Sequence, residues 1–145
     1  MITVQFTVRP DQGDASGFDL GDMVVSGDLG MADSAGHVPD QGMMIYPSVV
    51  LLMDGLRSFL QSNARMHSFI GIDTSFNLVV RRTKNGLSVA GKGGVVARAT
   101  VLEVVSAVLS AAEDLGRGLP PEDAVASDLE GAVAEFRSLV TTTVL

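Results

Sequence analysis

Four short runs of alternating apolar and polar residues follow one another between residues 66 and 99, with only two or three residues between successive runs. They are HSFIGID (67–73), FNLVVRRTK (76–84), LSVAG (87–91) and VVARA (95–99). Alternation with a period of two is typical of β-strands that bury one face. Because connections this short join antiparallel neighbours, the segment predicts a four-strand antiparallel meander, and this sheet limits the folds open to the chain.

The connection between the second and third runs admits two interpretations. The stretch NGLSVAGKGG (85–94) matches seven of the eight positions of a phosphate-binding loop, G-x-x-x-x-G-K-[ST]. The eighth position, where that loop needs a Ser or Thr to hold magnesium, is a glycine. Asn85-Gly86 is the preferred pair for a two-residue type I′ turn, which would place Lys84 opposite Leu87. We therefore predict a hairpin and expect no nucleotide cofactor.

The N-terminal third predicts two strands and a loop. Residues 2–9 alternate cleanly, with Ile, Val, Phe and Val on one side, and a second strand is expected from Phe18 to about Val25. From residue 26 to about residue 44 the chain is rich in Gly, Asp and Ser and has little periodicity. This composition predicts a long irregular loop, and long loops often carry function.

Three helices are predicted from their start signals and apolar stripes. Pro47 suits the first turn of a helix over residues 47–62, which is apolar on more than one side. Thr100 and Glu103 form the T-x-x-E capping box before a second helix that ends near Gly116. Pro120 and the proline after it introduce the third helix.

These elements predict an α+β fold, mostly antiparallel sheet, in which an N-terminal strand pair and the meander carry about three helices on one face. At 145 residues and 46% hydrophobic composition, the chain is long enough to bury a substantial core. No domain linker or internal repeat interrupts it, so we expect a single α+β domain over residues 1–145.

The charge distribution favours a basic protein partner over nucleic acid. The net charge is −7, and residues 1–44 hold seven Asp but only one cation, Arg9. So acidic a chain is poorly suited to the many phosphate contacts of nucleic-acid binding. Surface carboxylates instead attract a basic protein and guide its approach. The residues predicted to contact such a partner are Asp19, Asp22, Asp28, Asp33 and Asp40.

No cofactor, metal site or catalytic residue is assigned from the sequence. The stretch DQGDASGFDLGD (11–22) departs from a calcium-binding loop at its third, fifth and sixth positions, and the spacing of His37 and His67 matches no metal motif. Asp54 and Asp73 are the carboxylates to inspect first for acid–base chemistry, although a solvated helix face and a strand-end turn, respectively, are the favoured explanations of their positions.

The chain is expected to be soluble and cytoplasmic, without membrane association. Its longest apolar run, VVLLM (49–53), is far too short to span a bilayer. It contains no cysteine, which fits a reducing compartment. The first ten residues lack the charged and then apolar layout of a signal peptide.

Three stretches resemble small actinobacterial proteins of uncharacterised families: HSFIGIDTSFNLVVRR (67–82), LEVVSAVLSAAEDL (102–115) and EFRSLV (135–140). Some such families are polymorphic-toxin immunity proteins, so the resemblance implies a non-enzymatic module that binds a basic partner, such as a toxin domain, through an acidic surface. The alternative is a small-ligand-binding protein or enzyme with a pocket between the sheet and helix 47–62. A third option is a homo-oligomer built by pairing strand edges.

Overall fold

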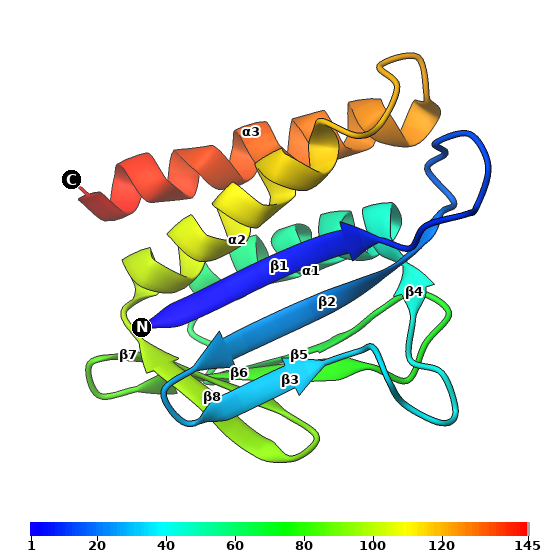
Figure 1. Cartoon of the computed structure of the whole chain (residues 1–145). Helices are drawn as coiled ribbons and strands as arrows, with labels where there is room; N and C mark the ends of the chain where they lie inside the picture. Colours follow the sequence, from blue (N-terminus) through cyan, green and yellow to red (C-terminus); the bar gives the residue numbers. More distant parts are fainter. Residues whose placement is uncertain (145) are drawn as a thin grey trace.

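Two antiparallel sheets and three helices make up the computed structural model, which describes residues 1–144 (Figure 1). Sheet A contains β1 (Ile2–Val8), β2 (Leu20–Gly27), β3 (Gly30–Asp33) and β4 (Met43–Met44). Sheet B contains β5 (Met66–Ile70), β6 (Asn77–Thr83), β7 (Gly86–Gly91) and β8 (Gly94–Ala99). The helices are α1 (Ile45–Leu60), α2 (Val101–Gly116) and α3 (Ala124–Val144). The predicted α+β class is confirmed, and among residues 1–144 no helix combines the length and apolarity needed to cross a membrane.

The predicted irregular loop over residues 26–44 is wrong in part. The second strand runs on to Gly27, the chain turns within two residues, and β3 pairs back along β2 as far as Asp33. β4 then pairs with Leu20 and Gly21 on the same edge of β2. Only residues 34–42 are irregular between these strands. Periodicity missed β3 because its sequence, GMAD, is short and weakly apolar, and its partner strand stabilises it instead.

Sheet B is the predicted meander, with its strands in the order β5-β6-β7-β8. The β6–β7 turn lies one residue earlier than predicted, because Thr83 pairs with Gly86. The two turn residues are therefore Lys84 and Asn85, and neither has the positive φ that a type I′ turn requires.

Packing explains why Gly86 lies in the strand and not in the turn. A Cβ at this position would come within 2.3 Å of the Ala99 carbonyl oxygen on β8. The pairing differs from the predicted one by two residues, an even number, so the same side chains face inward in both registers. The buried ones are Leu78, Val80, Leu87 and Val89. Ser88, which alternation places on the opposite face, is buried as well.

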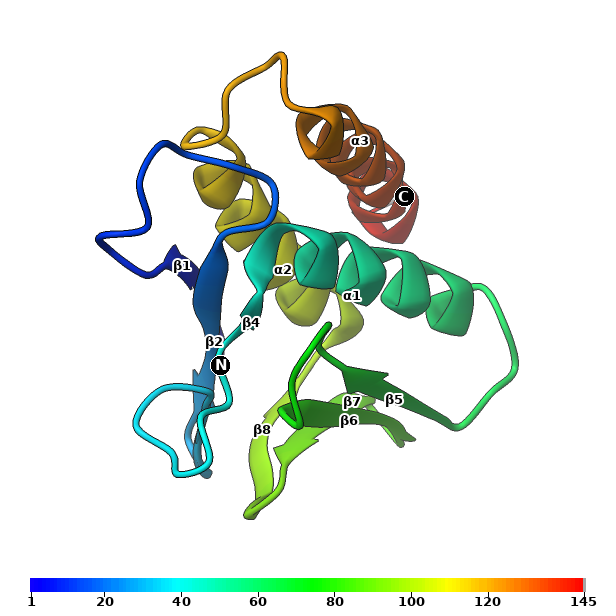
Figure 2. The ribbon, with the colours of Figure 1, turned by 90° about the vertical axis from the view of Figure 1, so that its right-hand side faces the viewer.

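The two sheets meet at a corner built from the smallest side chains. Gly27 of β2 lies against Ala97 of β8, and Gly91 of β7 lies against Ala32 of β3. A Cβ added to Gly27 or Gly91 would come within 2.5 Å or 2.7 Å of the facing alanine Cβ, respectively. The sheets diverge from this corner, and α1 lies in the opening between them (Figure 2).

α1 packs against both sheets and against α3. It starts and ends two residues earlier than the predicted 47–62. Its buried residues, spread over more than one side as predicted, are Ile45, Tyr46, Ser48, Val49, Leu52, Met53, Leu56 and Phe59. Leu51, by contrast, is 46% exposed.

α2 and α3 form the outer helical layer, α2 over β1 and α3 over α1 and α2. The predicted capping box is confirmed, since Glu103 N–H donates to Thr100 Oγ1 at 3.1 Å and Thr100 N–H donates to Glu103 Oε1 at 2.9 Å. α3 starts at Ala124, a few residues after the proline pair, and the Asp123 carboxylate accepts the Val125 N–H at 2.9 Å.

Candidate functional site

A groove of about 580 Å³ opens where β3 and the loop over residues 34–42 face sheet B. Residues 29–33 form one wall, and the loop adds His37, Val38, Pro39 and Gln41. The other wall consists of residues 75–77 and of residues 91–96, which include the β7–β8 turn and the start of β8. The groove therefore lies between segments that are far apart in the sequence, beyond the corner where the two sheets meet.

Apolar side chains are exposed along both walls of this groove. Met31 of β3 is 63% exposed and Val38 of the loop is fully exposed, while Leu29 and Val95 are partly exposed on either side. Contiguous apolar surface of this kind, rimmed by polar residues, marks binding sites on proteins more often than single exposed side chains do.

The outer edge of β3 is open at Met31 and Asp33, whereas the Leu29 N–H, just before β3, donates to the Val96 carbonyl oxygen of β8 at 3.1 Å. Ser34 N–H donates to the Met23 carbonyl oxygen at 3.1 Å, so hydrogen-bonded pairs alternate along the ladder from that pair. In the observed register, Ala32 and Gly30 form the next bonded pairs with β2. The backbone N–H and C=O groups of Met31 and Asp33 consequently point away from β2.

A charged cluster around Arg9 fixes the loop that forms one wall of the groove. Arg9 binds Asp22 through Nε and Nη2, at 2.9 and 3.0 Å, and binds Asp40 through Nη1 and Nη2, at 2.7 and 2.8 Å. Ser34 Oγ, which is fully buried, donates to Asp22 Oδ1 at 2.7 Å and accepts the Met23 N–H at 3.0 Å. The loop is therefore bound to β2 directly at its start, through Ser34, and indirectly near its end, where Asp40 binds Arg9 and Arg9 binds Asp22.

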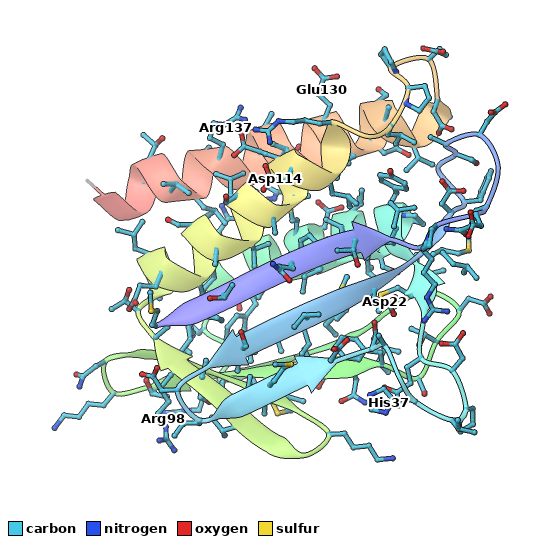
Figure 3. All side chains as sticks on the ribbon, viewed as in Figure 1. Asp22, His37, Arg98, Asp114, Glu130 and Arg137 are labelled. Carbon is cyan, nitrogen blue, oxygen red and sulfur yellow. The ribbon has the colours of Figure 1, made fainter. Side chains whose placement is uncertain are left out.

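Bidentate hydrogen bonds between an Arg guanidinium and a carboxylate are among the strongest hydrogen bonds in proteins. The Arg9 guanidinium holds the pKa of Asp22 and of Asp40 below the ordinary value for aspartate, and both carboxylates raise the pKa of Arg9. All three groups are therefore charged near neutral pH, and the cluster shapes the groove wall instead of supplying a proton donor or acceptor. Figure 3 shows Asp22 and His37 at the same end of sheet A.

The five predicted contact residues lie in three different settings. Asp19 is buried, and its carboxylate accepts the Ser16 N–H at 3.1 Å. Asp22 and Asp40 belong to the Arg9 cluster. Asp28 is exposed in the β2–β3 turn, and half-buried Asp33 ends β3, where its Oδ1 accepts the Ala35 N–H at 2.8 Å. Asp28 and Asp33 thus flank the open edge of β3.

The alternative prediction places a pocket between the sheet and helix 47–62, but no residue of α1 lines this groove. The two carboxylates selected for inspection, Asp54 on α1 and Asp73 after β5, are both exposed and lie outside it.

His67 stacks on Phe59, with ring centroids 6.0 Å apart, and burial lowers its pKa. Among residues 1–144, no group of His, Cys, Asp and Glu is arranged to hold a metal ion.

Sequence reasoning missed the apolar residues of the groove, namely Leu29, Met31, Val38 and Val95. A usable signal exists for the first two. Gly27 and Gly30 bracket a two-residue turn after an alternating strand, a spacing that indicates a hairpin. Val38 and Val95 come from other segments, and only the fold brings them to the same groove.

Comparisons with known family models, curated proteins and solved structures found no match for this chain.

Proposed function

We propose that this chain is a cytoplasmic, non-enzymatic module that binds a basic protein at the groove beside β3, as an inhibitor or immunity protein binds its toxin. One observation carries the proposal: Asp28 and Asp33 stand at the two ends of an open strand edge, with exposed Met31 between them. Apolar contact surface flanked by carboxylates suits an apolar segment that also carries Lys or Arg.

The side chains of the groove support binding over catalysis. Its ionisable residues are Asp33, His37 and Lys92. His37 Nε2 lies 2.6 Å from the Asp33 backbone carbonyl oxygen, not from a carboxylate, and Lys92 lies in the turn of the opposite wall. Acid–base chemistry needs such groups to converge on one reacting atom.

A small-ligand site is the second candidate, since the groove volume lies within the usual range for ligand pockets. Such pockets enclose most of the ligand surface. Here the rim residues Met31 and Val38 are largely exposed, which favours a larger partner that covers them.

The products of the genes that flank the gene of this chain are the partners to test. Binding of each purified product is measured by calorimetry at low and at physiological ionic strength. We expect one basic product to bind, with an affinity that falls as salt screens the carboxylates. The double variant Asp28→Asn/Asp33→Asn should weaken binding, mainly through the association rate.

The matched control is Asp54→Asn/Asp128→Asn, which removes the same charge from exposed positions on α1 and α3. It should leave the affinity close to that of the unmodified chain. The proposal is wrong if no flanking product binds, or if both double variants weaken binding equally. Light scattering of the chain alone tests the third option, a homo-oligomer.

A further inference from the structure

We infer that the partner binds by adding an extended strand to the open edge of β3, antiparallel to it, inside the groove. The inference rests on the proposed function and specifies how recognition takes place. Strand addition is a recurring mode of protein recognition, in which backbone hydrogen bonds give affinity and alternate side chains give specificity.

The backbone of β3 offers three groups to such a strand. These are the N–H and C=O of Met31 and the N–H of Asp33, which point away from β2. The Asp33 carbonyl oxygen is already in contact with His37 Nε2. An antiparallel guest residue opposite Met31 would exchange two hydrogen bonds with it, and the Asp33 N–H would donate a third.

The opposite wall leaves room for the side chains of the guest. Gly93 and Gly94 line the groove, and a Cβ built on either one would meet no atom within 4 Å. Side chains alternate along a strand. Every second guest side chain would therefore point toward this space, and the others would lie on the outer face beside Met31 and Asp33.

Charge selects a basic strand from another protein over a second copy of the chain. In a symmetric antiparallel pairing of two β3 strands about Met31, Asp33 of one copy would lie opposite Leu29 of the other, next to its Asp28. The carboxylates of the two copies would then lie near each other without being directly opposite, and like charges repel at short range. A guest with Lys or Arg at its outward positions would instead face both carboxylates.

The probe is a set of short peptides selected from a phage-displayed random library against the intact chain. We expect the selected peptides to alternate apolar residues and to carry Lys or Arg. Each peptide is then resynthesised in two forms, with N-methyl groups on alternate backbone amides. One form loses the N–H groups that face β3 and should bind about tenfold more weakly or not at all, while the other keeps them and should bind normally.

Two variants of the chain test the same geometry from the other side. Met31→Pro removes an N–H that β2 does not use, because this position belongs to a non-bonded pair. Gly93→Leu fills the open wall, where a Cβ meets no atom within 4 Å. Each variant should weaken peptide binding at least about tenfold. Circular dichroism checks that each variant retains the fold. Hydrogen exchange should show the Met31 and Asp33 amides protected by the bound peptide.

The outcomes separate this inference from the proposed function. Peptides that bind Met31→Pro and Gly93→Leu as tightly as the unmodified chain, without protecting the two amides, overturn strand addition. So does a selection that yields no peptide, or one that yields acidic peptides. A flanking-gene product that binds in a manner sensitive to Asp28→Asn/Asp33→Asn, but without protection of Met31, keeps the proposed function and removes this inference alone.

Discussion

Arg9 illustrates how one side chain orders a segment whose own sequence lacks periodicity. It joins Asp22 on β2 to Asp40 in the loop over residues 34–42, and so holds one wall of the groove in place. These partners lie 13 and 31 residues away from Arg9. The sequence indicates only that Arg9 is the single cation of the acidic N-terminal third.

The Arg9 cluster makes stability depend on pH below about pH 4. Because folding lowers the pKa of Asp22 and Asp40, their contribution is fully present above the unfolded aspartate value of about 3.9 and is lost as pH falls through the folded values. Asp22→Asn should lower the free energy of unfolding by roughly 1–3 kcal/mol near neutral pH and should reduce its acid dependence. Urea unfolding at several pH values measures both effects, and an acid dependence equal to that of exposed Asp54→Asn would contradict them.

Arg82 stabilises the end of α1 from the neighbouring sheet. Its Nε donates to the Ala64 carbonyl oxygen at 2.8 Å, its Nη2 donates to those of Phe59 and Ser62 at 2.9 Å, and the guanidinium carbon lies 4.7 Å from the Phe59 ring centroid. Lysine cannot reproduce this planar fork. Arg82→Lys should therefore cost roughly 1–3 kcal/mol in unfolding free energy.

The control for Arg82→Lys is the adjacent Arg81→Lys, on the exposed face of β6. A surface change of this kind should stay within about 0.5 kcal/mol. Chemical denaturation of both variants measures the difference, and equal losses would show that the capping contacts contribute nothing specific.

At the scale of elements, predictability follows the range of the interactions that define each one. The α2 capping box lies within four residues and was predicted correctly. The four strands of the meander were found from alternation, but the position of the β6–β7 turn was not, because contact between Gly86 and the next strand decides it. β3 was missed because its sequence, GMAD, is short and weakly apolar, and the open edge of the groove was missed with it.

The corner between the sheets depends on the absence of a side chain at Gly27. A Cβ there would lie 2.5 Å from the Ala97 Cβ and 2.8 Å from the Val96 carbonyl oxygen, which belongs to the backbone and yields little. Gly27→Ala should therefore destabilise the fold by roughly 1–3 kcal/mol. Gly93→Ala is the matched control, since its Cβ would meet no atom within 4 Å, and it should be neutral or slightly stabilising. Thermal unfolding compares the two, and equal melting temperatures would refute this account of the corner.

At the scale of the whole molecule, the charges divide between the two sheets. The cations of residues 54–98 that are exposed lie on sheet B, in its turns or just before it, and they are Arg65, Arg81, Lys84, Lys92 and Arg98. Asp28 and Asp33 border the open edge of sheet A. A basic partner is therefore attracted to the β3 side and repelled by the cations of sheet B, among them Lys92 on the opposite wall of the groove, which orients the partner toward β3.

The predicted single domain has a cooperative consequence that unfolding experiments can test. Buried residues of both sheets and all three helices form one cluster, with α1 against both sheets, so neither sheet keeps its core when the other is lost. We expect one two-state transition in urea, with the same midpoint by far-ultraviolet circular dichroism and by the near-ultraviolet signal of Tyr46, which is 1% exposed. Tyr46 is the only tyrosine and there is no tryptophan, so its signal reports on the α1 environment. Two separated midpoints would mean that the sheets unfold as independent units, and the groove between them would then be lost at the first midpoint, while the other sheet is still folded.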